Sequence, residues 1–123
     1  MKVRALLVAS AGMLTIATSA TNASAEARFE SGNDLYSLCI NVDSRAAASD
    51  DFVCLGYVSA IADAMVANNN EIAGFRACLR DGLTLRQLSD VVEKWLQNHP
   101  EKRDFSAPGL VAHAFAEAFP CSQ

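Results

Sequence analysis

The two histidines are among the few side chains in this sequence whose type and spacing could support chemistry. His113 and Glu117 are four residues apart, so on a helix they share one face. Such a pair could form half of a metal site or an acid/base pair, but no third ligand or nucleophile accompanies it, so a helical ion pair is the favoured interpretation. His99 ends a predicted helix, where the helix dipole alone favours an imidazolium. Neither histidine predicts catalysis.

Cysteine is the other candidate for chemistry. The chain has four, at Cys39, Cys54, Cys78 and Cys121. Their spacings do not fit a zinc site, and there is no Cys-x-x-Cys redox motif. Disulfides are therefore expected. Of the three possible connectivities, Cys39–Cys54 with Cys78–Cys121 is favoured, because each pair then joins consecutive or terminal helix ends.

Other site motifs are missing from the sequence. It contains no paired-carboxylate pattern, no glycine-rich phosphate loop and no metal-ligand spacing, and its glycines are scattered singly. Because the cysteines are expected in bridges, no nucleophile is left beside a base. We therefore predict a chain that is not an enzyme and uses no cofactor or metal.

The start of the chain has the pattern of a secretory signal. Lys2 and Arg4 precede an apolar run over residues 5–17, and Ala23-Ser24-Ala25 is a small-x-small cleavage site. The run is too short for a stable membrane span of roughly 20 apolar residues. We predict a signal peptide at 1–25 and a single exported helical domain at 26–123 that does not insert into a membrane. An oxidising compartment suits the expected disulfides.

The charge balance limits the class of partner. Removal of the two basic residues of the signal leaves 8 basic against 14 acidic residues, a net charge of −6. The charges are interspersed and no long basic run occurs, so nucleic acid is an improbable partner. The acidic balance suits a basic protein partner, although solubility explains it equally well.

The hydrophobic periodicity predicts helices throughout. They are expected over residues 31–40, 52–67, 84–99 and 107–119. Thr84 and Gln87 have capping-box spacing. The resulting class is all-α, a compact bundle of about four to five helices stapled by two disulfides.

The second predicted helix is apolar on almost every side. Asp63 is its only charge, so we expect it at the centre of the domain, capped by Asp50 or Asp51. The small residues Gly56, Ala60 and Ala64 follow a four-residue spacing that would let a neighbouring helix pack closely.

Five segments of the chain resemble one family. They are Gly-Asn-Asp-Leu-Tyr-Ser-Leu-Cys (32–39), Phe-Val-Cys-Leu-Gly-Tyr-Val-Ser-Ala-Ile-Ala-Asp-Ala (52–64), Cys-Leu-Arg-Asp-Gly-Leu-Thr-Leu-Arg-Gln-Leu (78–88), Val-Val-Glu-Lys-Trp-Leu-Gln-Asn-His-Pro-Glu (91–101) and Ala-Glu-Ala-Phe-Pro-Cys (116–121). In this order they resemble the Tai/resistance-associated-protein family of small periplasmic immunity proteins, over roughly residues 29–121. Family members guard against peptidoglycan amidase effectors of the bacterial type VI secretion system.

The resemblance implies a binding protein of a Gram-negative periplasm, with secretion from the cell as the alternative. Members are helical, disulfide-stabilised and often dimeric, and they block the cleft of an amidase effector. Such blocking needs a protruding rigid element. The expected partner-binding residues lie in the charged connection before the last helix: Asn98, His99, Glu101, Lys102, Arg103, Asp104 and Phe105. The second choice is the 67–77 connection with Asn68, Asn69, Asn70, Glu71 and Arg76.

Two other functions remain open at the level of sequence. One is a periplasmic stress chaperone, or holdase, which would expose apolar surface to unfolded clients. The other is a non-catalytic adaptor of an envelope complex, with the last helix as an interface. A tight stoichiometric partner would favour immunity, and weak binding of many unfolded clients would favour the chaperone.

Overall fold

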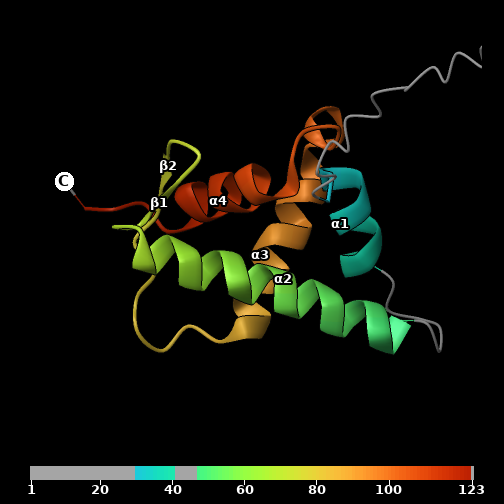
Figure 1. Ribbon diagram of the computed structural model, residues 1–123, viewed down its shortest axis with the longest axis horizontal. Helices are drawn as coiled ribbons and strands as arrows, with labels where there is room; N and C mark the ends of the chain where they lie inside the picture. The colour runs from blue at the N-terminus through green and yellow to red at the C-terminus, as the bar shows by residue number, and fades with distance from the viewer. Residues whose placement is uncertain (1–29, 41–46, 123) are drawn as a thin grey trace, which may run out of the picture.

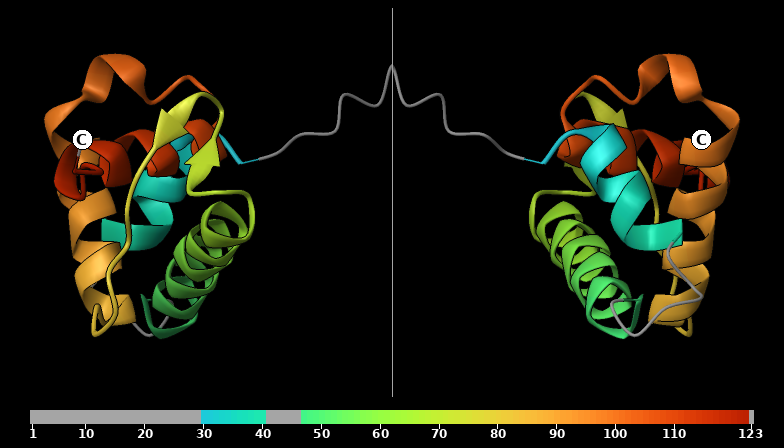
Figure 2. Two further views of the ribbon diagram at one scale, coloured as in Figure 1. Left: turned by 90° about the vertical axis from the view of Figure 1, so that its left-hand side faces the viewer. Right: turned by 90° about the vertical axis from the view of Figure 1, so that its right-hand side faces the viewer.

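The computed structural model describes residues 30–40 and 47–122, and the expected signal peptide lies outside them. Within these ranges the chain forms four α-helices, one 3₁₀ helix and one two-stranded antiparallel sheet. Figure 1 shows α1 and the 3₁₀ helix at one end of the molecule, and the hairpin and the C-terminal end at the other. The views in Figure 2 show α2 and α3 on opposite sides, with α1 between them. The predicted all-α bundle with two disulfides is confirmed.

Helix α1 spans Gly32–Ile40, close to the predicted 31–40. Ser31 precedes it and makes reciprocal contacts with Asp34. The Asp34 amide donates to Ser31 Oγ at 3.2 Å, and the Ser31 amide donates to Asp34 Oδ2 at 3.0 Å. These bonds satisfy amides that the first helical turn leaves without intrahelical acceptors, so the short helix has a defined start.

Helix α2 spans Ala47–Ala67 and starts five residues before the predicted start at Phe52. The expectation that Asp50 or Asp51 caps it is therefore wrong, because both lie inside the helix. Alanine has the highest helix propensity, and Ala47 and Ala48 extend the helix toward the N-terminus.

The expected central position of α2 is also wrong, because one of its faces is open. Cys54, Val58 and Met65 are buried, but Phe52 is 73% exposed and Val66 is 56% exposed. Gly56 belongs to the open side: a Cβ placed there would meet nothing within 4 Å. The small-residue spacing therefore brings no described helix close at Gly56. Packing against α1, α3 and α4 leaves this side uncovered.

A small hairpin follows α2 where irregular chain was expected. Strand β1 (Glu71–Ile72) pairs with β2 (Phe75–Arg76). The two turn residues between them, Ala73 and Gly74, have φ of 51° and 81°. Positive φ at both positions is the geometry of a type I′ hairpin turn. Two-residue strands are too short to show alternation, so the sequence pattern did not predict them.

Helices α3 (Leu85–Asn98) and α4 (Ala107–Ala118) complete the bundle. Helix α3 has the predicted capping box: the Gln87 amide donates to Thr84 Oγ1 at 3.2 Å, and the Thr84 amide donates to Gln87 Oε1 at 2.8 Å. The core combines side chains from all four helices with Ala77. Its largest fully buried members are Phe115, Leu35, Met65, Leu96, Val58, Val92 and Val111.

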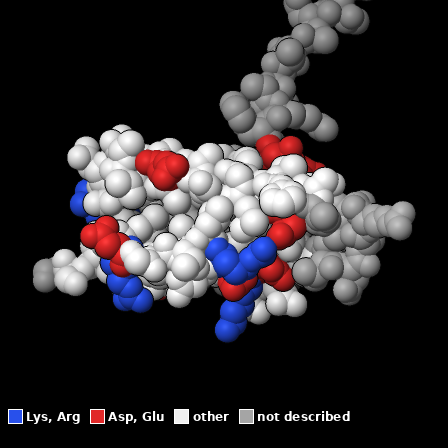
Figure 3. All heavy atoms as spheres, turned by 90° about the horizontal axis from the view of Figure 1, so that it is seen from below, with Lys and Arg blue, Asp and Glu red and all other residues white. Residues whose placement is uncertain are grey.

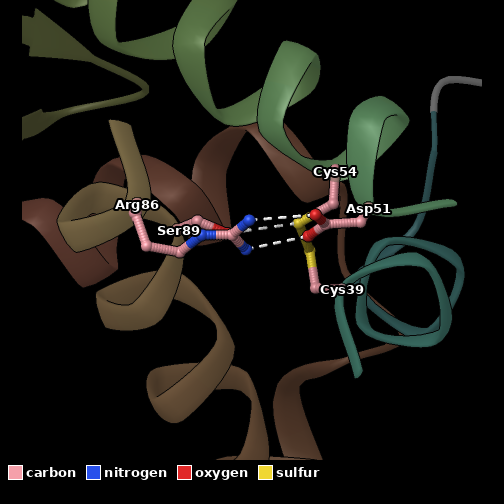
Figure 4. The surroundings of a disulfide bond; sticks show 5 residues. All are labelled: Cys39, Asp51, Cys54, Arg86 and Ser89. Carbon is pink, nitrogen blue, oxygen red and sulfur yellow. Dashed lines mark hydrogen bonds and ion pairs between the residues drawn. A yellow bond between two sulfur atoms is a disulfide. The ribbon is translucent and has the colours of Figure 1, made fainter. Parts of the chain in front are cut away.

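The disulfides are Cys39–Cys54 and Cys78–Cys121, the predicted pairing. Figure 4 shows that the first joins the end of α1 to α2, beside an ion pair between Asp51 and Arg86. Its Cys54 Sγ lies 3.5 Å from the buried Ser89 Oγ of α3. In the chain-entropy account, closing a loop of this length stabilises the fold by about 3 kcal/mol.

Candidate partner-binding surface

The connection between α3 and α4 is tied to the start of α1 by its backbone. It contains the 3₁₀ helix η1, Pro100–Lys102. The Asn33 amide donates to the Arg103 carbonyl at 2.7 Å, and the Gly32 amide donates to the Phe105 carbonyl at 2.9 Å. A third bond runs from the Ala107 amide to the Glu30 carbonyl at 2.9 Å. These hydrogen bonds between distant segments of the chain fix the backbone of the connection.

Arg103, a predicted contact residue, has internal partners. Its Nε donates to the Leu96 carbonyl at 2.7 Å and its Nη2 to the Gln97 carbonyl at 3.2 Å. These carbonyls belong to the last turn of α3, where no following helical turn supplies N–H donors, so the guanidinium N–H groups take that place. The guanidinium also lies 3.6 Å from the centroid of the Tyr36 ring, a cation–π contact with α1. Arg103 therefore joins three elements and positions the connection.

His99, another predicted contact residue, packs against the core tryptophan. Its Nδ1 lies 2.7 Å from the Trp95 carbonyl oxygen, and its ring stacks on the Trp95 indole with centroids 4.2 Å apart. His99 is half-buried. It therefore holds the end of α3 at the point where the chain turns into η1.

The second histidine belongs to the same aromatic group. The His113 ring lies 4.9 Å from the Trp95 ring and stacks on Phe75 of β2 at 4.3 Å. The expected pair with Glu117 is present, with His113 Nε2 3.1 Å from Glu117 Oε1. Trp95 Nε1 donates to the other oxygen of Glu117 at 2.9 Å. The rings of Phe75, His113, Trp95 and His99 thus form a continuous series across three elements.

Other residues of the connection between α3 and α4 have side chains that face outward and are available to a partner. Asn98, Glu101 and Asp104 are exposed, and Phe105 is 61% exposed. Lys102 is half-buried and forms no ion pair with any carboxylate in the described ranges. An exposed phenylalanine on a fixed backbone loses little conformational entropy on binding, and such aromatic side chains are frequent hot spots of protein interfaces.

A pocket adjoins this outward side. It has a volume of about 350 Å³ and is lined by Phe75, Lys102, Phe105, Ser106, Gly109, Leu110 and His113. Most of these side chains are apolar or aromatic, and Lys102 is the one cationic member. Only Lys102 and Phe105 of this group were predicted as contact residues. For the other lining residues, the one available sequence signal was Gly109, an isolated glycine inside the last predicted helix.

The second predicted contact segment, 67–77, is also ordered by internal bonds. Asn68 Nδ2 donates to the Glu71 carbonyl at 2.7 Å, and Arg76 Nη2 lies 3.5 Å from Glu71 Oε2 across the hairpin. Asn69 and Asn70 have φ of 56° and 64°, in the left-handed region that asparagine tolerates. Their sequence therefore has a local structural explanation in the turn after α2.

The described residues offer no group of three or more His, Cys, Asp or Glu side chains arranged to hold a metal. Nor is any helix in residues 30–40 and 47–122 long and apolar enough to cross a membrane. On the face shown in Figure 3, basic side chains lie next to acidic ones within a mainly uncharged surface. That face has the mixed charge expected from the sequence.

A comparison with protein families identifies the chain. The sequence model of the Rap1a immunity proteins matches residues 31–121, which includes every described helix and both disulfides. The chain belongs to the Rap1a immunity protein family. Neither a curated protein nor a solved structure matches it significantly. Membership implies an effector protein as binding partner and a role that is generally non-enzymatic. The disulfides fit export.

Two residues that hold the connection of this Rap1a family member were not predicted as functional. Tyr36 supplies the ring under Arg103. At Gly32 a Cβ would clash with the Leu110 side chain and would lie 2.8 Å from Arg103 Cα. Close approach of two backbones therefore requires glycine there. Nothing in the sequence around Gly32 indicated this contact, because its partners are about 70 positions away in the chain.

Proposed function

We propose that the mature chain, residues 26–123, is a periplasmic immunity protein that binds a peptidoglycan amidase effector of the type VI secretion system and occludes its active-site cleft. Membership of an immunity family supports an effector as partner. The amidase target rests on the sequence resemblance of the five segments described above. The predicted signal peptide and the two disulfides support action outside the cytoplasm.

The observation that best supports this function is the fixed connection between α3 and α4, which has an exposed aromatic side chain. Three backbone bonds to the start of the described chain hold residues 103–107, and Phe105 projects from them with 61% of its surface exposed. Glu101 and Asp104 are exposed next to it, and their negative charges favour basic groups opposite them on the effector. Asn98 and Lys102 complete the proposed contact set, while His99 and Arg103 position it from within.

The test begins with the oxidised mature protein as an inhibitor of purified secreted amidases from its own bacterium. Cleavage of a soluble muropeptide is followed while the inhibitor concentration is raised. A tight complex gives activity that falls linearly and reaches zero near one inhibitor per enzyme. A set of amidases that all remain active at a large excess of inhibitor would contradict the amidase target.

Two exposed phenylalanines provide a matched pair of variants. Phe105→Ala removes the side chain of the connection, and we expect inhibition to weaken at least tenfold. Phe52→Ala removes a phenylalanine that is 73% exposed on α2, and inhibition should stay unchanged. Equal weakening by both variants would argue against the connection as the contact surface.

Family resemblance also carries the expectation of a homodimer. Sedimentation of the oxidised mature chain alone and with its effector tests this state separately from inhibition. Affinity capture with the oxidised mature chain tests the alternative. Recovery of many partly unfolded proteins, in place of one stoichiometric partner, would favour the holdase function.

A further inference from the structure

The pocket beside Phe105 has features of a binding site that the proposed contact set does not use. Its volume of about 350 Å³ falls within the range of small-ligand sites, roughly 300–1,000 Å³. Aromatic walls come from Phe75 and His113, and an aliphatic wall comes from Leu110. Phe105 lines the pocket and is also 61% exposed, so an exposed apolar side chain and an apolar cavity lie next to each other.

The aromatic wall of the pocket is held before any ligand arrives. Phe75 stacks on His113 with ring planes 14° apart. His113 is in turn held by Glu117, and Glu117 accepts a hydrogen bond from the buried Trp95. Because each ring is fixed by the next, little side-chain entropy is lost when the pocket is filled. A preformed cavity of this kind favours binding of a rigid apolar group.

The charge at the pocket is the feature that selects the ligand. Lys102 lines the pocket and has no carboxylate partner in residues 30–40 and 47–122. The mature chain has a net charge of −6, and the cation at the pocket is one of only 8 basic residues in it. A ligand that places an apolar group among the rings and a carboxylate near Lys102 would satisfy both parts.

We propose that this pocket receives an apolar side chain of the effector that has a carboxylate next to it, and that Lys102 pairs with that carboxylate. The assignment rests on the proposed immunity function, and it adds a cavity to the projecting Phe105. The interface is then reciprocal: Phe105 enters the effector, and an effector side chain enters this pocket.

Gly109 allows the pocket to be filled without damage to the fold. It lies within α4, and a Cβ there would meet only Ala73 Cβ at 3.7 Å, an ordinary contact. Gly109→Leu therefore places a side chain in the pocket while it raises helix propensity. Gly56→Leu is the matched control, because Gly56 is also a helical glycine with open space around it.

The first experiment uses small probes and needs no effector. ¹⁵N-labelled oxidised chain 26–123 is titrated with N-acetyl-leucine, with N-acetyl-leucinamide, which lacks the carboxylate, and with N-acetyl-glycine, which lacks the apolar group. We expect N-acetyl-leucine to shift the amides of Lys102, Ser106 and His113, with a Kd on the order of millimolar. The other two probes should bind at least fivefold more weakly.

The variants decide the location and the role of the charge. Gly109→Leu should abolish binding of N-acetyl-leucine, and Gly56→Leu should leave it unchanged. Lys102→Gln should lower the affinity to that of the uncharged amide probe. Arg80→Gln is its control, since Arg80 lies in the connection between β2 and α3, which runs to the end of α3 away from η1 (Figure 1). Binding that survives Gly109→Leu, or the absence of saturable binding, would overturn the proposal.

Amidase inhibition then tests the pocket within the interface. Gly109→Leu should weaken inhibition at least tenfold and Gly56→Leu should not. If the unaltered chain binds the probe but Gly109→Leu still inhibits the amidase fully, the pocket does not receive an effector side chain, and the proposal is overturned. If the unaltered chain inhibits no amidase, the proposed function fails, and the probe titrations still decide whether the pocket takes an apolar carboxylate.

Two other occupants would each be recognised by a different result. Probe binding to a chain that starts at Glu30, but not to chain 26–123, would assign the pocket to residues 26–29 of the same molecule. Dissociation of a dimer by Gly109→Leu in sedimentation would assign it to a second copy. Either result would overturn the proposal.

Discussion

Asp51 of α2 and Arg86 of α3 form a two-point ion pair beside the Cys39–Cys54 disulfide. Arg86 Nη1 lies 2.9 Å from Asp51 Oδ1, and Arg86 Nη2 lies 2.9 Å from Asp51 Oδ2 (Figure 4). The parallel geometry is the strong form of a carboxylate–guanidinium contact. It joins the N-terminal part of α2 to the first turn of α3.

This ion pair predicts a pH-dependent contribution to stability. The hydrogen bond to Arg86 lowers the pKa of Asp51 below its usual value of 3.8. A carboxylate whose pKa is lower in the folded state stabilises the fold above about pH 4, and that contribution disappears as the pH falls through the folded pKa. Asp51→Asn should therefore lower the Tm at pH 7, and the difference from the unaltered chain should shrink below pH 4.

The control for this prediction is Asp63→Asn, which removes an exposed carboxylate of α2 with no ion pair among the described residues. Thermal unfolding followed by circular dichroism from pH 2 to pH 7 checks both variants. A deficit of Asp51→Asn that stays constant over this range would show that the charge of Asp51 is not its cause. Added salt should reduce the deficit at pH 7, because the pair is partly exposed.

Arg103 gives a second prediction, on the need for a guanidinium. Arg103→Lys keeps the positive charge but cannot bond both carbonyls at the end of α3 and cover the Tyr36 ring at once. We expect the free energy of unfolding to fall by about 1–2 kcal/mol. Urea unfolding measures the loss, and Arg80→Lys, at an exposed arginine, should change it little. The amide of Asn33 should also exchange faster, since its acceptor is the Arg103 carbonyl.

Two glycine-to-alanine substitutions are expected to have opposite signs. At Gly32 the added Cβ would meet the Leu110 side chain and the Arg103 backbone, so one of them must shift. Overpacking of this kind costs about 1–3 kcal/mol. At Gly56 the added Cβ is in open space on a helix, so Gly56→Ala should stabilise the fold by up to about 1 kcal/mol. Denaturant unfolding of both variants checks the contrast, and a stable Gly32→Ala chain would show that α1 can move away from the connection without loss.

The helices could be predicted because their signals are local, and the disulfide pairing could be predicted from the order of the helices along the chain. The capping box at Thr84 and the apolar stripe through Trp95 depend on residues within a few turns of each other. The start of α2 and its open face could not be predicted. Helix propensity extends through Ala47, but which side of an apolar helix is covered depends on how many neighbours the rest of the chain supplies.

The candidate site shows the same division. The charge and exposure of Glu101 and Asp104 follow from composition, and both residues are at the surface as expected. The internal roles of His99 and Arg103 depend on Trp95 and on Tyr36, which lies in another helix. A charged residue in a connection has the same sequence pattern whether it faces solvent or the end of a helix. Only the fold separates these two cases.

The two disulfides should differ in their effect on the connection. Helix α1 has nine residues, which is too few for a stable isolated helix. Cys39–Cys54 holds its C-terminal end to α2, and the bonds from Gly32 and Asn33 join its N-terminal end to the connection. Cys78–Cys121 closes a span of 43 residues and joins the chain after β2 to the C-terminal end. Only the first bridge therefore holds an element, α1, that is hydrogen-bonded to the proposed contact surface.

Removal of each bridge by paired alanine substitutions separates global stability from local order. In the chain-entropy account the longer loop is worth about 4 kcal/mol and the shorter about 3 kcal/mol, so Cys78→Ala/Cys121→Ala should lower the Tm more. Cys39→Ala/Cys54→Ala should nevertheless be cleaved faster by trypsin after Lys102 and Arg103 at 10 °C, because loosening α1 frees the connection while the rest stays folded. Cleavage rates that follow the Tm order would contradict this. The expected result would mean that the surface proposed to meet the effector reaches its final form only after oxidation of the chain.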